Sequence, residues 1–161
     1  MAKVYTCASD CLQGFHLMAV DVVTEIEIAR QRTEVAAFAC DPDNATRWYE
    51  NIESVEWRTP PPLTVGTRLE FVARFLGRRL TYTYEVREHV AEERFVMSTA
   101  QGPFPMETTY LFEEIPQGTR MSLRNRGEPS GFAKVGAPLM ERAMRRANQA
   151  DLRRIKALLE A

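Results

Sequence analysis

The stretch GFAKVGAPLMERAMRRANQADLRRIKALLE, residues 131–160, closes the chain with one long amphipathic pattern, and this pattern decides the fold. About 30 residues at a rise of about 1.5 Å each would make a helix roughly 45 Å long, enough to cross a whole sheet. Pro138 has no N–H to donate, so we expect a bend or a loosened turn in the first part of this helix. At about 100° per residue, the polar side comprises Arg142, Arg145, Arg146, Gln149, Arg153 and Lys156, and the apolar side comprises Ala137, Met140, Met144, Ala147, Ile155 and Leu158.

The segments before this helix are predicted to be mostly strands. Their apolar and polar residues fall on two faces with the period of two that is typical of a strand. Their connections are short, which favours antiparallel pairing, and one face is mostly apolar, which fits a sheet packed on one side. The strands are predicted at residues 20–29, 52–58, 66–75, 79–87, 94–100, 106–113 and 119–125.

Two short helices are predicted after the first strand, at residues 33–40 and 42–49. Asp41 can cap the second helix, and Pro42 suits its first position. The predicted fold is therefore α+β, with a curved antiparallel sheet of about seven strands wrapped around the long C-terminal helix. We assign this single domain to residues 20–161 and treat residues 1–19, which lack a sustained period, as an N-terminal extension.

Composition argues against several functional classes. The formal net charge of -1 argues against a general nucleic-acid binder. No apolar run approaches the roughly 20 residues needed to span a bilayer, and no secretory signal opens the sequence, so we expect no membrane insertion. The cysteines are too few and too scattered for a disulfide framework, which makes a reducing cytoplasm the expected location.

The sequence contains no evident catalytic or metal-ligating constellation. Cys7, Cys11 and His16 lack the fourth ligand that a zinc site normally needs. Cys40 ends a predicted buried helix and has no histidine near it in sequence, so we expect a small buried hydrophobe. His89 is predicted to be a surface residue at a strand end, with a general base as the open alternative. We therefore predict no catalytic residue, no metal site and no cofactor, and a solvated arginine face on the last helix.

Several short motifs together resemble a known superfamily through their order and spacing. They are Asp41-Pro42-Asp43 with Trp48 soon after, Gly66-Thr67, Gly77-Arg78-Arg79, Gly102-Pro103-Phe104, Gly118-Thr119 and the closing residues 151–160. From about residue 20 onward, the chain is similar to the START-like, or helix-grip, superfamily, which includes polyketide cyclases and dehydrases and ligand carriers of the birch-pollen-allergen type. The resemblance implies a helix-grip fold with a cavity. It implies no single activity, because the superfamily includes carriers, cyclases and hydrolases.

An apolar stripe on the strands and the last helix is the candidate ligand site, although much of it must be plain core. The helix offers small side chains such as Ala143 and Ala147 where a filled core would place Leu or Ile. Tyr and Thr hydroxyls on the expected inner face need partners, and a mostly apolar pocket with a few polar groups describes a ligand site. Together with the resemblance, this favours a pocket. The predicted ligand-binding residues are Trp57, Phe71, Phe75, Tyr82, Tyr84, Met97, Thr108, Tyr110, Met121, Met140 and Met144.

Three hypotheses about function follow. The first is a non-enzymatic carrier of a small hydrophobic molecule, and the second is an aromatase/cyclase-type enzyme that folds a polyketide chain in the same cavity. The third is an interaction module, such as a homodimer, with a vestigial cavity. A charged or histidine group deep in the cavity would favour the enzyme, and a uniformly apolar cavity would favour the carrier. A filled interior with a large exposed apolar patch would favour the module.

Asp151 interrupts the apolar face of the last helix, between Ala147 and Ile155. A buried, unpaired carboxylate is costly, so we predict a structural Asp151 with a hydrogen-bond partner. That partner would be an Arg, a Tyr or Trp donor, or a backbone N–H of the short helices. The functional alternative is an acid that lines the pocket, which would favour an enzyme.

Overall fold

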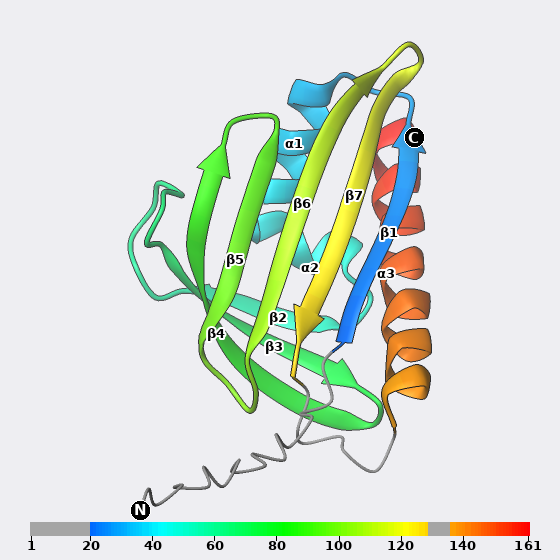
Figure 1. Ribbon diagram of the computed structural model, residues 1–161. Helices are drawn as coiled ribbons and strands as arrows, with labels where there is room; N and C mark the ends of the chain where they lie inside the picture. The colour runs from blue at the N-terminus through cyan, green and yellow to red at the C-terminus, as the bar shows by residue number, and fades with distance from the viewer. Residues whose placement is uncertain (1–19, 129–135) are drawn as a thin grey trace, which may run out of the picture.

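The computed structural model describes residues 20–128 and 136–161, and its sheet has seven strands in the order β1-β7-β6-β5-β4-β3-β2 (Figure 1). Every neighbouring pair of strands is antiparallel. The predicted α+β fold is confirmed, with strand ends shifted by a few residues. The strands are β1 (Val20–Ile28), β2 (Ile52–Trp57), β3 (Arg68–Phe75), β4 (Arg78–Val90), β5 (Arg94–Gln101), β6 (Met106–Ile115) and β7 (Gly118–Gly127).

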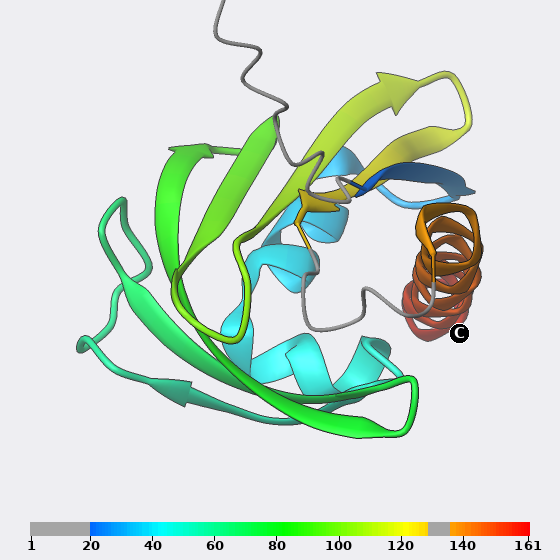
Figure 2. The same ribbon diagram turned by 60° about the horizontal axis from the view of Figure 1, so that its bottom comes forward.

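The sheet curves strongly, and irregular pairing of β4 contributes to the curvature. The register between β4 and β5 shifts between Thr83 and Tyr84 and again between Val86 and Glu88. Such bulges bend a strand and increase its local twist. Figure 2 shows that β3 and β4 turn away from β6 and β7, so that the sheet curls round the short helices.

The short helices form as the sequence predicts, except that the second is divided in two. The backbone N–H of Asp43 donates to Asp41 Oδ1 at 2.9 Å, which confirms the predicted cap. Pro42 occupies the first position, where a missing N–H costs nothing. The elements are α1 (Arg32–Cys40), the 3-10 helix η1 (Pro42–Asn44) and α2 (Ala45–Trp48).

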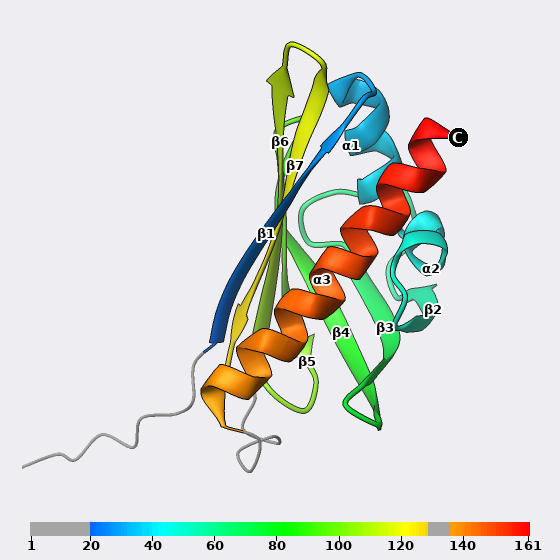
Figure 3. The same cartoon turned by 90° about the vertical axis from the view of Figure 1, so that its right-hand side faces the viewer.

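The closing helix, α3 (Ala137–Glu160), has 24 residues and packs mainly along β1 (Figure 3). Gly136 precedes it with a φ of 80°, a left-handed conformation that cannot belong to the helix. The predicted start near residue 131 was therefore wrong, and residues 131–135 lie outside the described part of the chain. The predicted bend at Pro138 was also wrong, because this proline lies in the first turn, where no N–H is needed.

The two faces of α3 are largely as predicted, with corrections on the apolar side. Leu158 is 38% exposed, so its placement on the buried face was wrong. Asn148 and Leu152, which were not assigned to that face, are 4% and 1% exposed. The arginine side is solvated as predicted, since Arg142, Arg145, Arg146 and Arg153 are all exposed.

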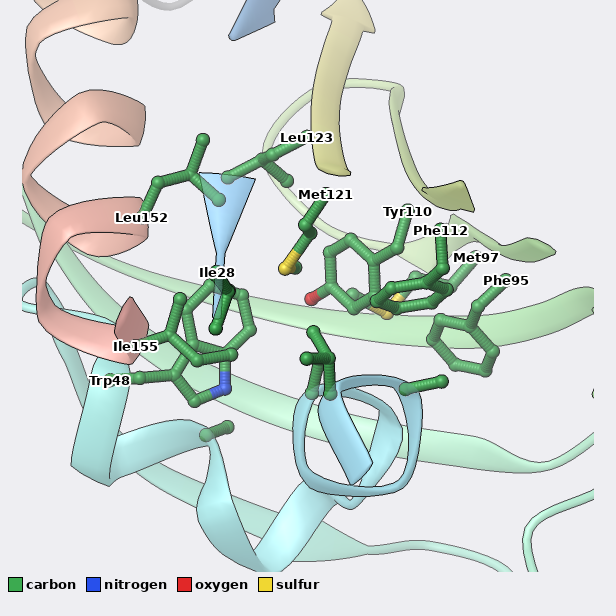
Figure 4. Close-up of a cluster of buried hydrophobic side chains, with 14 of the residues drawn as sticks. Ile28, Trp48, Phe95, Met97, Tyr110, Phe112, Met121, Leu123, Leu152 and Ile155 are labelled. Atoms are coloured by element: carbon green, nitrogen blue, oxygen red, sulfur yellow. The ribbon is translucent and has the colours of Figure 1, made fainter. Parts of the chain in front are cut away.

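The main hydrophobic core lies between the short helices, the C-terminal half of α3 and the sheet. Figure 4 shows Trp48 of α2 beside Leu152 and Ile155 of α3, with Met121 and Leu123 of β7 nearby. These five side chains are at most 1% exposed. Burying a large apolar side chain of this kind stabilises a fold by about 1.5 to 3 kcal/mol, so this cluster anchors α3 to the sheet.

Candidate functional site

A cavity of about 150 Å³ lies between α3 and the concave side of the sheet. Its walls come from the segment between α2 and β2, the end of β3, the first half of β4, the loop before β6, the end of β7 and the N-terminal two thirds of α3. The predicted cavity between the last helix and the sheet is therefore present. It lies towards the β3–β4 hairpin, and Tyr49, which stacks on Trp48, also lines it.

Aromatic and methionine side chains make most of the apolar wall. Tyr82 and Phe104 meet edge to face, with ring centroids 5.6 Å apart. The loop that carries Phe104 comes this close because of Gly102, where a Cβ would lie 2.6 Å from Cδ1 of Tyr82. Met140 and Met144 contribute from α3 and are 1% and 8% exposed. Methionine adapts easily to differently shaped partners, which suits a binding wall.

A line of hydrogen-bonded polar side chains reaches the cavity from the sheet. Thr108 Oγ1 donates to Asn125 Oδ1 at 2.7 Å, and Asn125 Nδ2 donates to Asn148 Oδ1 at 2.9 Å. Asn148 Nδ2 is buried and has no hydrogen-bond partner among residues 20–128 and 136–161. An unsatisfied buried donor costs about 1 to 3 kcal/mol, so this atom is a candidate ligand contact.

Asp151 lies one turn beyond Asn148 on α3, is 3% exposed and also lines the cavity. The backbone N–H of Glu50, just after α2, donates to Asp151 Oδ1 at 2.8 Å. Burial raises the pKa of Asp151 to about 7, and the Glu50 N–H offsets part of that rise. The predicted pairing with a backbone N–H near the short helices is confirmed, and the alternative, an acid lining the pocket, holds as well.

Three tyrosines bring neutral hydroxyls to this region. The hydroxyls of Tyr49 and Tyr110 are 2.6 Å apart, and burial raises the pKa of both well above the ordinary value. Burial also raises the pKa of Tyr84 to about 12, although the hydroxyl of Thr108 partly offsets the rise. All three therefore remain protonated at neutral pH and act as hydrogen-bonding groups.

The structure brings only some of the predicted ligand-binding residues to the cavity. Those at its wall are Phe75, Tyr82, Tyr84, Met140 and Met144. Those buried in the sheet instead are Phe71, Met97, Thr108, Tyr110 and Met121. Trp57 is half-buried, packs against the core that holds most of this second group and donates its Nε1–H to Asp43 Oδ1 at 2.9 Å. A ligand-binding role for any of them remains a prediction.

Sequence reasoning did not identify the amide partners Asn125 and Asn148 as site residues. For Asn148 a signal was available, because it precedes Asp151 by three positions and so shares its helix face. For Asn125 there was none. It reaches the site only because β6 and β7 pair with Thr108 opposite Asn125.

The other reactive residues behave as the sequence predicts where the structure describes them. Cys40 is a free, half-buried thiol, and burial raises its pKa to about 12, so it is not an activated nucleophile. His89 is exposed near the end of β4. Cys7, Cys11 and His16 lie outside the described residues. Within residues 20–128 and 136–161, no cluster of three or more His, Cys, Asp or Glu could hold a metal ion.

A larger surface depression, of about 780 Å³, is lined mainly by residues 29–34 and 114–118. Its wall includes the ion pair between Arg30 and Glu34, which are 3.6 Å apart. Its lining is mostly polar and lacks the apolar surface that holds a small molecule. The cavity beside α3 is therefore the better candidate site. No helix in the described part of the chain is both long and apolar enough to cross a membrane.

Comparison with known proteins agrees with this fold and cavity. The family model described as polyketide cyclase / dehydrase and lipid transport matches residues 19–160. The chain belongs to this family. The match covers nearly all of the described residues, and it confirms the START-like resemblance that the sequence motifs indicate. No curated protein matches the chain.

Solved structures resemble this member of the polyketide cyclase/dehydrase family along most of its length. A Thermus thermophilus protein has a TM-score of 0.73 at 22% identity, covering 85% of this chain and 94% of its own. A START superfamily protein from Mycobacterium smegmatis has a TM-score of 0.72 at 14% identity, with coverages of 88% and 97%. The di-domain ARO/CYC StfQ of the steffimycin biosynthetic pathway has a TM-score of 0.70 at 15% identity, with coverages of 88% and 51%. At these identities the likeness establishes the fold alone.

Proposed function

We propose that this protein binds a small, mostly hydrophobic molecule in the cavity between α3 and the sheet. The composition of the wall carries the proposal: aromatic, methionine and leucine side chains make most of it, and a few polar side chains, including Asn125, Asn148 and Asp151, border the rest. Such walls gain affinity from the apolar surface and orient the ligand through the few polar groups. The family description, which names polyketide chemistry and lipid transport, supports the same class of ligand.

The cavity volume of about 150 Å³ limits what enters without rearrangement. An apolar cavity of about that volume holds a benzene-sized molecule, whereas drug-sized ligands occupy roughly 300 to 1,000 Å³. A ligand with one ring therefore fits the cavity as it stands. A larger ligand requires the β3–β4 hairpin and α3 to move apart.

Native mass spectrometry of protein purified from its own host tests this proposal. Ala147 lines the cavity, so Ala147→Leu should fill part of it and exclude the co-purified molecule. Ala157, exposed on the same helix, provides the matched control Ala157→Leu, which should keep the molecule bound. If neither a host molecule nor a ring-sized probe such as acetophenone binds the wild-type protein, the proposal is wrong.

An aromatase/cyclase-type enzyme is the second candidate function, and the acid in the cavity favours it. With a pKa of about 7, Asp151 exchanges its proton readily at neutral pH, as a general acid or base must. A carbonyl compound bound beside it would be open to enolisation. Wild-type protein should then accelerate exchange of the α-protons of acetophenone for deuterium, followed by NMR. The variant Asp151→Asn keeps an acceptor for the Glu50 N–H but should not accelerate this exchange. Equal exchange rates with wild type and with the variant would exclude Asp151 as the catalytic acid or base.

The remaining predictions concern assembly and location. The interaction-module hypothesis expects a filled interior, so the cavity weighs against it. A homodimer and a cytoplasmic location remain predictions, which light scattering and fractionation of host cells would test.

A further inference from the structure

Asn148 lines the cavity, and its side-chain amide has a donor that is unused within the described part of the chain. The Thr108 hydroxyl donates to Asn125 Oδ1, which leaves the Asn125 amide N–H to donate to Asn148 Oδ1. Asn148 Oδ1 is thereby occupied, and Nδ2 is the atom left buried without a partner among the described residues. Since an amide nitrogen only donates, the ligand that satisfies it must offer an acceptor.

The carboxyl group of Asp151 presents the complementary requirement. Its Oδ1 accepts from the Glu50 N–H, so Oδ2 is the oxygen that we assign to the ligand. An ionised carboxylate only accepts, so the matching ligand group must be a donor. A donor next to a charged acceptor makes a stronger hydrogen bond than a neutral pair does.

The spacing along α3 fixes how far apart these two ligand groups lie. Asn148 and Asp151 are three residues apart, so their Cβ atoms are about 5 to 6 Å from each other on one helix face. The acceptor and donor of the ligand must then lie within two or three bonds of each other. Most of the remaining wall is apolar, from Phe75, Leu80 and Phe104 on the sheet side to Met140 and Met144 on α3, and Asn51 and Arg74 also border the cavity.

From this geometry we infer that the cavity selects ring-sized apolar molecules that carry, at one end, a carbonyl oxygen beside an N–H or O–H donor. The carbonyl accepts from Asn148 Nδ2, and the donor gives its hydrogen to Asp151 Oδ2. Primary carboxamides and α-hydroxy ketones have this arrangement. The inference rests on the proposed function, because it names the ligand class of the same cavity.

Three probes of nearly the same shape test the inference by isothermal titration. Benzamide carries acceptor and donor, acetophenone carries the acceptor alone, and α-methylstyrene carries neither. The preference for acetophenone over α-methylstyrene should fall about tenfold in Asn148→Leu, because one hydrogen bond to a buried donor is lost. Gln149→Leu removes the same amide from the exposed neighbouring position and should leave that preference unchanged.

The Asp151 half of the inference is tested by the preference for benzamide over acetophenone. In wild-type protein this preference should rise about fivefold between pH 5.5 and 8.5, as Asp151 ionises and becomes a charged acceptor. Asp151→Asn should lower it and abolish the pH dependence. The charged or titratable groups acting on or lining the cavity near Asp151 are Glu50, Arg154, Tyr49, Tyr110, Tyr84 and Arg74. The raised pKa values of these tyrosines keep them protonated throughout this range.

The possible results separate the inference from the proposed function. If all three probes bind and their relative affinities stay the same in Asn148→Leu and at both pH values, the inference is wrong while the cavity still binds ligands. If no probe binds wild-type protein at millimolar concentration, the proposed function fails and the inference fails with it. Should Asn148→Leu not fold, as judged by circular dichroism, Asn148→Ala replaces it with the same expected loss of preference, and the pH series on wild-type protein still tests the Asp151 half.

Discussion

The two halves of α3 border interiors of different kinds. Towards its C-terminus, Leu152 and Ile155 pack against Trp48 in a closed cluster, and these three side chains are at most 1% exposed. Towards its N-terminus, Met144 and Ala147 border the cavity. One continuous helix thus holds the fold together at one end and offers a binding wall at the other.

The difference lies in the size and shape of the side chains that α3 presents. Branched Leu and Ile with a facing Trp fill space densely, whereas Ala and unbranched Met leave or adapt to it. Asn148 and Asp151 lie on the same buried face between the two regions. The closed end can therefore position these polar groups, while the open end leaves room for a molecule that uses them.

Shortening a buried side chain in each half of α3 should have unequal effects on the free energy of unfolding. Leu152→Ala should lower the free energy of unfolding by about 3 to 5 kcal/mol, because a closed core cannot collapse around the space left. Met144→Ala should cost about 2 kcal/mol or less, because it enlarges a space that already exists. Urea denaturation of both variants measures this. Equal losses would show that the two ends are packed alike.

The acid between the two regions should make stability depend on pH. The folded-state pKa of Asp151 is about 7 against an ordinary value of 3.8, so the folded protein retains a proton that the unfolded chain has lost. Asp151 therefore lowers stability progressively as pH rises from about 4 to about 7, by a few kcal/mol in total, and no further above that range.

Asp151→Asn should remove this pH-dependent loss of stability, so the variant should be more stable than wild type at pH 8. The exposed control Glu114→Gln should keep the pH dependence of wild-type stability. Thermal or urea unfolding at pH 5 and pH 8 provides the comparison. A variant that unfolds with the wild-type pH dependence would contradict the raised pKa of Asp151.

At the open end, Tyr84→Phe should change binding more than folding. Tyr84 lines the cavity, and losing one hydrogen bond from its hydroxyl should weaken the binding of a polar ligand by about 1 kcal/mol. The Phe ring keeps the edge-to-face contact with Phe71, whose centroid is 5.5 Å away, so unfolding should change little. Unchanged affinity for benzamide would remove Tyr84 from the site.

The smallest effect is expected from deleting residues 1–19. These residues lack strand or helix periodicity, and the family model begins at residue 19. The shortened protein should unfold within a few degrees of the full chain, with probe binding unchanged. A large fall in the unfolding temperature, or loss of a dimer, would show that the extension is structural.

The sequence by itself determined the element order, the antiparallel sheet and most of both faces of α3, because these follow from local periodicity. It also identified the Asp41 cap, and it placed Tyr82, Tyr84, Met140 and Met144 on inner faces that do border the cavity. Each of these predictions needs only the period of a strand or a helix, or the chemistry of a turn.

The tertiary structure alone decided where along those faces the interior stays open. Tyr110 and Met121 have the same periodicity as Tyr82, yet they lie in the filled core. The polar site depends on the strand register that sets Asn125 beside Thr108, and on a hydrogen bond from Glu50 to Asp151 across 101 positions of sequence. Periodicity specifies which side of an element faces inward. Only the packing of distant elements determines what each inward side chain meets.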